Sequence, residues 1–163
     1  QLDLNRTETG VTVSRWIYGQ LPSPYYAGLV KFEGECDRLQ YYELRTPSIA
    51  INKSVYTPAG TGGPDKPLVD KTYINMSYNF MTPVDEDNTR YFWFQHRNTD
   101  PDDEAVSQFM NDGARVAFEE DRAILTEVHR GMHDRETPNI DLRLDAGAKL
   151  FRKQLQQKID AEG

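Results

Sequence analysis

The sequence predicts an α+β domain in which a curved antiparallel sheet packs on a long C-terminal helix. The first two-thirds of the 163 residues hold six strand-like segments separated by turn signals. The last third changes to the 3.6-residue period of an amphipathic helix. Strands followed by helices are typical of the α+β class, and the apolar face of an antiparallel sheet needs a cover. We therefore expect the sheet to wrap around the helix, with a cavity between them.

The six predicted strands are bounded by turn-forming residues. They cover residues 2–8, 11–18, 38–45, 48–56, 71–81 and 89–96. The pair Thr9-Gly10 is a hairpin signal, and residues 83–88 form a polar turn. The stretch from Tyr25 to Phe32 is consistent with either a short helix or an irregular loop. Residues 59–67, rich in Gly and Pro, are expected to form a mobile loop.

Two helices are predicted in the last third of the chain. The segment Pro101-Asp102-Asp103-Glu104 opens the first, with acidic residues where the helix dipole favours them. Its pattern runs to about His133, and Pro138 ends it. A short extended stretch at residues 140–144 follows. Asp145 then caps a second helix, whose expected buried residues are Leu150, Phe151, Leu155 and Ile159.

The composition excludes several classes of function. The net charge of −7 argues against nucleic acid or an anionic membrane surface as a partner, because both require clustered Lys and Arg. Cys36 is the only cysteine, which excludes a disulfide framework or a Cys-rich metal site in these residues and makes a reducing cytoplasm the default location. No apolar run approaches the ~20 residues of a spanning helix. No phosphate-binding loop, nucleophile elbow or Cys–His pair occurs.

The chain has the length of one domain and is predicted to be a single unit over residues 1–163. Its first residues, Gln1-Leu2-Asp3-Leu4, have no basic or apolar signal region. They enter strand-like sequence directly. We expect from this that the chain is part of a longer protein.

Asp121 is a carboxylate at the centre of the apolar stripe of the long predicted helix. At about 100° per residue, the apolar residues that lie within about 60° of it are Met110, Ala114, Ala117, Phe118, Ile124, Leu125, Val128 and Met132. A buried carboxylate must be paired, protonated or bound to a metal. Asp121 is therefore either a structural carboxylate, paired with a strand donor or with Arg90, or a metal ligand facing the cavity.

The three histidines each have two interpretations. His129 and His133 are four residues apart and share a helix side, a spacing that can bind a metal. They lie at roughly 80° and 120° from Asp121, at the edge of the polar face, where a solvated pair favoured by the helix dipole is the more common outcome. His96 shares a strand face with Phe92 and Phe94, and it is either a cavity residue or an ordinary strand-end histidine.

The segment Phe118-Glu119-Glu120-Asp121-Arg122-Ala123-Ile124-Leu125-Thr126-Glu127 resembles the final catalytic helix of Rieske non-haem iron oxygenases, in the branch of the vanillate and dicamba O-demethylases. Other motifs fit this branch in order and spacing. They are Thr82-Pro83, the strand Tyr91-Phe92-Trp93-Phe94 ending in Arg97-Asn98, and Leu144-Asp145-Ala146-Gly147 before a terminal helix. The resemblance covers most of residues 10–163.

The resemblance implies a helix-grip, START-like catalytic domain with Fe(II) held by two histidines and one carboxylate, which matches Asp121. It implies hydroxylation or O-demethylation of an aromatic compound with O2, a [2Fe–2S] Rieske cluster fed by a reductase or ferredoxin, and a homotrimer. The family's Asp-x-x-His-x4-5-His helix and its Rieske Cys-x-His and Cys-x-x-His pairs do not occur in these 163 residues. We therefore expect no tight iron binding and no catalysis by this chain alone.

Alignment by eye to this branch also indicates a substrate pocket. Asn52 and Arg90 fall at positions that contact the aromatic substrate, the Asn matching in type and the Arg replacing a His. Phe92, Phe94 and His96 share the strand face of Arg90 and are the expected pocket walls. The alternative is a START-like module that binds a hydrophobic small molecule without chemistry, with Asp121 in a structural role.

Overall fold

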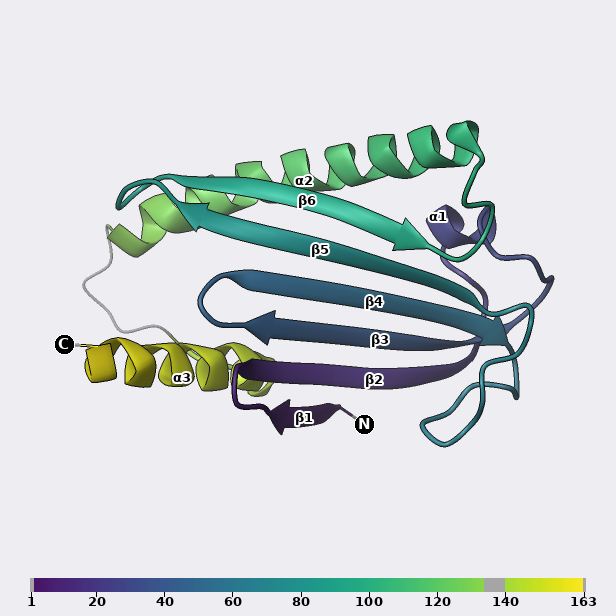
Figure 1. Cartoon of the computed structure of the whole chain (residues 1–163), viewed down its shortest axis with the longest axis horizontal. Coiled ribbons are helices and arrows are strands. Elements are labelled where there is room, and N and C mark those ends of the chain that lie inside the picture. Colours follow the sequence, from purple (N-terminus) through teal and green to yellow (C-terminus); the bar gives the residue numbers. More distant parts are fainter. Residues whose placement is uncertain (1, 134–139, 163) are drawn as a thin grey trace. The chain divides into compact units, whose positions relative to one another are not determined.

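The computed structural model describes residues 2–133 and 140–162 (Figure 1). The chain divides into two compact units. One contains Gln1–Thr99 and Arg143–Gly163, and the other contains Asp100–Leu142. Pro138, the predicted end of the long helix, lies outside the described residues. Among the helices that are described, none is long and apolar enough to cross a membrane.

The first unit is built on a curved sheet of six antiparallel strands in the order β1-β2-β3-β4-β5-β6 (Figure 1). The strands are Asp3–Arg6, Gly10–Gln20, Cys36–Arg45, Ile49–Pro58, Tyr73–Pro83 and Thr89–Arg97. Each strand pairs with its neighbour in sequence, as short turns between alternating segments predict. All six predicted strands are confirmed, with ends that differ by a few residues. The α+β class and the antiparallel sheet are confirmed with them.

The strand register defines two faces of the sheet, because paired residues point to the same side and successive residues alternate. One row runs through Tyr42, Asn52, Ser77 and Gln95. We name its side the Asn52 face. The adjacent row, through Ile51, Tyr78 and Phe94, lies on the opposite side, which we name the Phe94 face. These two faces differ in chemistry along the whole sheet.

A four-residue helix, α1 (Pro24–Ala27), packs on the Asn52 face and resolves the alternatives for the stretch after β2. Its Tyr26 ring lies 4.5 Å from the Tyr56 ring and 5.9 Å from the Tyr73 ring, centroid to centroid. Tyr56 and Tyr73 are almost fully buried. The remainder of the segment is irregular, with Leu29 buried beneath it. The sequence therefore forms both a short helix and a loop.

The Gly-rich loop after β4 is tied to the Phe94 face by one carboxylate. Asp37 is 2% exposed and accepts hydrogen bonds from the backbone N–H of Gly62 at 2.9 Å and of Gly19 at 3.2 Å. A Cβ on Gly62 would come within 2.6 Å of the Trp16 ring and 2.5 Å of the Asp37 Cβ. The glycine is required here because the loop backbone approaches these side chains closely.

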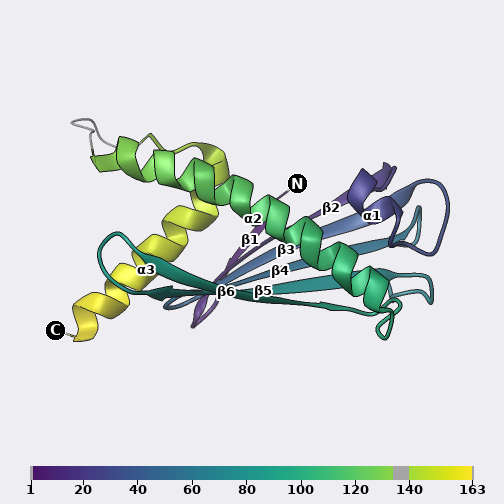
Figure 2. The same ribbon diagram turned by 90° about the horizontal axis from the view of Figure 1, so that it is seen from above.

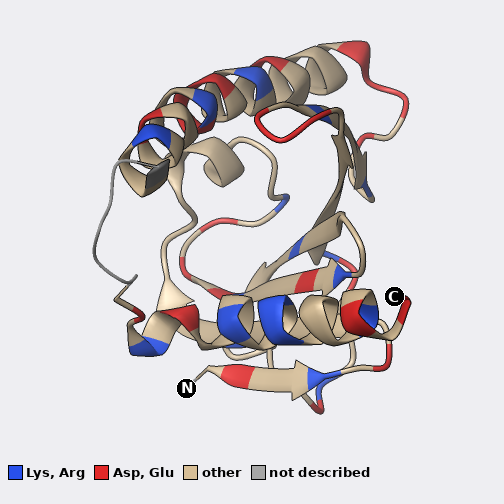
Figure 3. Ribbon diagram, turned by 90° about the vertical axis from the view of Figure 1, so that its left-hand side faces the viewer, with Lys and Arg blue, Asp and Glu red and all other residues tan. Residues whose placement is uncertain are grey.

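The C-terminal helix α3 (Ala146–Glu162) packs beside β2 on the Asn52 face (Figure 3). A Cβ on Gly147 would lie 2.7 Å from Val13 Cγ2, so the absent side chain permits the close approach. The buried Gln154 donates hydrogen bonds from Nε2 to the backbone carbonyls of Thr7 at 2.8 Å and Glu8 at 3.0 Å. These bonds fix α3 to the β1–β2 hairpin.

Two predictions about this segment need correction. The extended stretch is wrong at its end, because Arg143–Asp145 forms a 3-10 turn that leads directly into α3. The predicted burial of Ile159 is also wrong, since its side chain is 52% exposed one helical turn beyond the contacts made by Gln154 and Leu155. Leu150, Phe151 and Leu155 are half-buried, and the fully buried positions of α3 are Gly147 and Gln154.

The second unit is dominated by α2 (Glu104–His133), one uninterrupted helix of 30 residues (Figure 2). Asp103 caps it, because its Oδ1 accepts the backbone N–H of Ala105 at 2.8 Å and of Val106 at 3.2 Å. The predicted helix is therefore confirmed over its described residues, Glu104–His133. Its polar side carries ion pairs between Glu119 and Arg122 and between Glu127 and Arg130.

Candidate functional site

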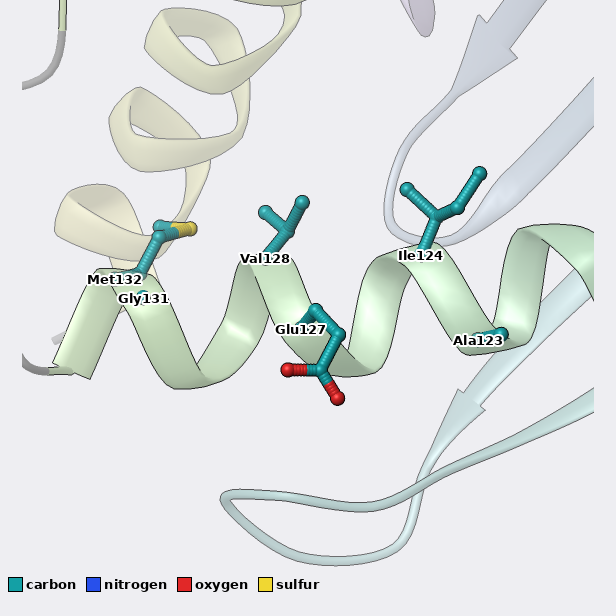
Figure 4. Close-up of a pocket in the computed structure, with 6 residues that line it drawn as sticks. All are labelled: Ala123, Ile124, Glu127, Val128, Gly131 and Met132. Carbon is teal, nitrogen blue, oxygen red and sulfur yellow. The ribbon is translucent and has the colours of Figure 1, made fainter.

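Asp121 lies in the middle of α2 and is exposed. The apolar stripe that flanks it is also exposed over the second half of the helix, with Ile124 62% and Leu125 63% accessible. Figure 4 shows Ile124, Val128 and Met132 projecting from one side of the helix, with Glu127 pointing away from them. The apolar stripe predicted around Asp121 is present. Within the described structure, its side chains from Ile124 to Met132 are exposed rather than buried.

The described residues do not by themselves form a metal site. Across residues 2–133 and 140–162, no three His, Cys, Asp or Glu side chains gather closely enough to hold a metal ion. Asp121 makes no hydrogen bond or ion pair with its neighbours along α2, where Arg122 is already bonded to Glu119 at 2.8 Å. An exposed, unpaired carboxylate can accept a cation, but it supplies one ligand where Fe(II) in such sites takes three from protein.

The predicted pocket residues Arg90, Phe92, Phe94 and His96 share the Phe94 face, as their alternation in β6 indicates. The Phe94 ring stacks on Tyr78 with centroids 4.9 Å apart and lies 5.2 Å from the His96 ring. Phe80 adds a further stacked ring at 5.9 Å from Phe94. Phe92 and Phe94 remain 55% and 44% exposed. This is an aromatic surface at the β6 edge of the sheet.

Asn52 does not join this surface. Its partner in β5 is Ser77, and the partner of Ser77 in β6 is Gln95, one residue after Phe94. A difference of one residue in a strand reverses the side to which a side chain points. The register therefore divides the predicted pocket residues between opposite faces, and they do not line one wall.

The Asn52 face carries a group of polar side chains that sequence reasoning missed. Asn75, Ser77 and Asn79 alternate along β5, and Asn75 and Asn79 are 7% and 1% exposed. Asn79 donates to the Ala50 carbonyl at 3.2 Å and accepts from the Tyr91 hydroxyl at 2.9 Å. The sequence did contain a signal, since three amide or hydroxyl residues at alternate positions are unusual on a covered strand face.

Asn75 is the least satisfied member of this group. Its Nδ2 donates to Gln95 Oε1 at 3.4 Å, a long contact, and its buried Oδ1 has no hydrogen-bond partner among the described residues. Buried polar atoms are paired in the great majority of cases, so this oxygen is an exception among the described residues. Asn75 is paired across the sheet with Ser54 and Arg97.

The tyrosines around α1 form the end of the same face. Burial raises the pKa of Tyr56 to about 12 and that of Tyr25 to about 12, and it raises the pKa of Tyr73 further. These phenols are therefore neutral at physiological pH, and the buried Tyr56 hydroxyl has no hydrogen-bond partner among the described residues. The guanidinium carbon of Arg38 lies 5.2 Å from the centroid of the Tyr56 ring.

Comparison with known proteins places this arrangement in a family. The sequence model described as "Vanillate O-demethylase oxygenase C-terminal domain" matches residues 1–161. The iron–sulfur subunit of a toluene-4-sulfonate monooxygenase system from Comamonas testosteroni is 32% identical over 99% of this chain and 47% of its own length. A vanillate O-demethylase oxygenase subunit from a Pseudomonas strain is 27% identical over 91% of this chain and 46% of its length.

The fold is similar to that of a solved oxygenase. The crystal structure of apo dicamba monooxygenase superposes with a TM-score of 0.82 at 17% identity, over 99% of this chain and 51% of that protein. The predicted helix-grip architecture is confirmed by this similarity. The chain spans about half the length of the curated relatives that it matches. Because the family match covers residues 1–161, the chain belongs to the vanillate O-demethylase oxygenase C-terminal domain family.

Proposed function

We propose that the chain is the C-terminal part of the catalytic domain of a Rieske-type oxygenase that hydroxylates or O-demethylates an aromatic compound with O2. The observation that carries this proposal is the family match, which covers almost the whole chain. The relatives support it, because they are named as subunits of oxygenases. Those relatives are about twice as long as this chain, so the activity is that of the whole protein. A membrane is not among the proposed partners, and neither is nucleic acid.

In this proposal Asp121 is the carboxylate ligand of a mononuclear Fe(II). Its exposed position on α2, without a partner along the helix, leaves both carboxylate oxygens available. Two histidines from outside these 163 residues would complete the facial set of ligands. When bound, the iron supplies redox chemistry with O2 that amino-acid side chains cannot provide. The chain's own contribution is a negative charge fixed on a rigid helix, which sets the geometry of the site.

The proposed partners follow from the relatives. The toluene-4-sulfonate monooxygenase relative is named as the iron–sulfur subunit of a system, which supports a [2Fe–2S] cluster and a separate electron donor, a reductase or ferredoxin. The names of the relatives also support an aromatic substrate. A homotrimer is proposed with them, in which the cluster of one subunit serves the iron of the next and the ring closes after three subunits.

The test uses the whole protein with a reductase, NADH and a panel of methoxylated and methylated arenes. Demethylation consumes one O2, two electrons and two protons for each methoxy group, and it releases formaldehyde and water with the phenol. Hydroxylation consumes the same reagents but leaves every carbon on the product. We expect arene-dependent O2 uptake with one of these products. Uptake that is independent of every arene, in protein with a full iron content, would contradict the proposal.

The alternative of a non-enzymatic START-like module is not favoured. It requires only the fold, whereas the family match and the relatives point specifically to oxygenase subunits. A protein whose purified full length holds neither iron nor acid-labile sulfide, yet binds arenes, would restore that alternative.

A further inference from the structure

The chain leaves the sheet at Asn98, the residue directly after β6. Its backbone N–H donates to the Ile74 carbonyl at 3.2 Å, as an antiparallel ladder requires at this pair. The reciprocal bond is different. The Ile74 N–H donates to the side-chain Oδ1 of Asn98 at 2.8 Å, in the place that a backbone carbonyl takes in a regular ladder. The side chain therefore completes the last pair of the ladder while the backbone turns away.

The partners of Asn98 belong to a buried part of the sheet. Its Nδ2 donates to the Thr72 carbonyl at 2.8 Å. Thr72 is 4% exposed, and its hydroxyl donates to Thr57 Oγ1 at 3.1 Å. Tyr73, between the two residues that Asn98 contacts, is 1% exposed. The Asn98 side chain is thus bonded to the backbone on both sides of a core tyrosine, and the point at which the chain leaves the sheet is fixed.

The connection from Asn98 to α2, residues 99–103, is also held by hydrogen bonds. Arg97 Nε donates to the Thr99 carbonyl at 2.9 Å. Asp100 has a left-handed backbone with a φ of 45°, which aspartate tolerates, and its carbonyl accepts the Asp103 N–H at 3.2 Å. Asp103 then caps the helix. A connection that is short and bonded in this way transmits the attachment of Asn98 to the first turn of α2.

Asp121 lies far along the helix from this attachment. It is 17 residues after Glu104 in one uninterrupted helix, a distance of about 25 Å. A change of about 2° in the direction of the helix therefore moves this carboxylate by about 1 Å. A misplacement of about 1 Å can lower a rate by about 100-fold. The apolar side chains beyond Asp121, from Ile124 to Met132, are exposed, so packing among the described residues does not hold this half of α2.

We propose that Asn98 is a positioning residue for the proposed metal ligand, because it fixes the direction in which α2 leaves the sheet and, through it, the location of Asp121. The inference rests on the proposed function, since it takes Asp121 to be a ligand of iron. It gives a role to Arg97-Asn98, a motif of the family resemblance that the site did not use. Asn98 acts only through the helix, so its loss changes iron binding and turnover more than arene binding.

The test compares the whole protein in three forms, the wild type, Asn98→Ala and the matched control Asn88→Ala. Asn88 lies at the opposite end of the β5–β6 hairpin, where its Nδ2 donates to Asp85 Oδ1 at 2.8 Å. We expect Asn98→Ala to bind mononuclear Fe(II) about 10- to 100-fold more weakly and to lose kcat by a similar factor, the range for residues that orient metal ligands. KM for the arene is expected to change by less than about 3-fold. Asn88→Ala is expected to change none of these quantities.

A second variant separates positioning from a general loss of structure. Asn98→Asp keeps the acceptor for the Ile74 N–H but not the donor to Thr72, and we expect its iron affinity and kcat to lie between those of Asn98→Ala and the wild type. All measurements are made well below the Tm of each variant, so that unfolded protein contributes to none of them. Iron affinity and kcat in both Asn98 variants that equal those of Asn88→Ala would overturn the proposal, as would a loss of kcat with unchanged iron affinity.

Failure of the positioning role and failure of the proposed function are distinguishable. Arene-dependent O2 uptake by the wild type, with no difference between Asn98→Ala and Asn88→Ala, supports the oxygenase and contradicts the positioning role. Weaker Fe(II) binding by Asn98→Ala than by Asn88→Ala, in a protein whose O2 uptake is independent of every arene, supports the positioning role and contradicts the oxygenase.

Discussion

Removal of the Asp37 carboxylate is expected to release the loop that follows β4. The two backbone N–H groups that it accepts, from Gly62 and Gly19, form hydrogen bonds to a charged acceptor, each of which contributes about 1.5–3 kcal/mol. Gly62 is buried, so its N–H would be left without water in the Asp37→Ala variant, whereas Gly19 is half-buried and can be rehydrated. The loss should therefore lie in the lower part of the summed range, about 3–4 kcal/mol.

The loss is measured by thermal unfolding and by hydrogen exchange of the whole protein. For a domain of this size it corresponds to a decrease in Tm of roughly 10 °C. Exchange should accelerate in peptides that span residues 59–66 and should remain unchanged in β5. Asp37→Asn is expected to lose about half as much, because one oxygen acceptor remains. The exposed Asp3→Asn serves as the control. A loss below about 1 kcal/mol in Asp37→Ala, with the loop still protected, would refute this account of the clamp.

Three other perturbations have expected outcomes. Gly62→Ala should destabilise by about 1–3 kcal/mol through overpacking, measured by urea unfolding, whereas Gly28→Ala, with nothing within 4 Å of its added Cβ, should be neutral. The hydrogen bond from Arg45 lowers the pKa of Glu43, so the pair stabilises the fold above the unfolded value of about 4.3 and ceases to do so as pH falls through the lower folded value. Arg45→Gln should therefore lower Tm at pH 7, and the loss in Tm should shrink as the solution is acidified through the folded pKa of Glu43. Gln154→Leu should cost about 1–3 kcal/mol and accelerate exchange in α3, and unchanged exchange there would contradict its anchoring role.

The elements of the fold were predictable because their signals are local. The hairpin at Thr9-Gly10 and the 3.6-residue period from Glu104 to His133 each depend on neighbouring residues, and both are present in the structure. The burial of Gln154 was not predictable in this way. It depends on two carbonyls of a turn about 150 residues earlier in the chain. The same limit applies to Ile159, whose apolar character predicted burial but whose side chain is 52% exposed.

The candidate site was predictable only in part. The face of the sheet to which each side chain points depends on how the strands are paired, and the sequence of one strand does not show this. The sequence alone shows that Phe92, Phe94 and His96 share a side of one strand. It does not show that Asn52 in another strand points to the opposite side, since this follows from its pairing with Ser77.

The most direct test of the central claim is the mononuclear iron content of the Asp121→Ala variant of the whole protein. Iron and acid-labile sulfide are measured together, so that cluster iron is separated from the mononuclear iron. Glu120→Ala is the matched control, because it removes the adjacent carboxylate of the same helix. The account predicts that Asp121→Ala loses the mononuclear iron while cluster iron, sulfide and Tm are unchanged, and that Glu120→Ala loses neither. Retention of full mononuclear iron by Asp121→Ala would contradict the assignment of Asp121 as a ligand.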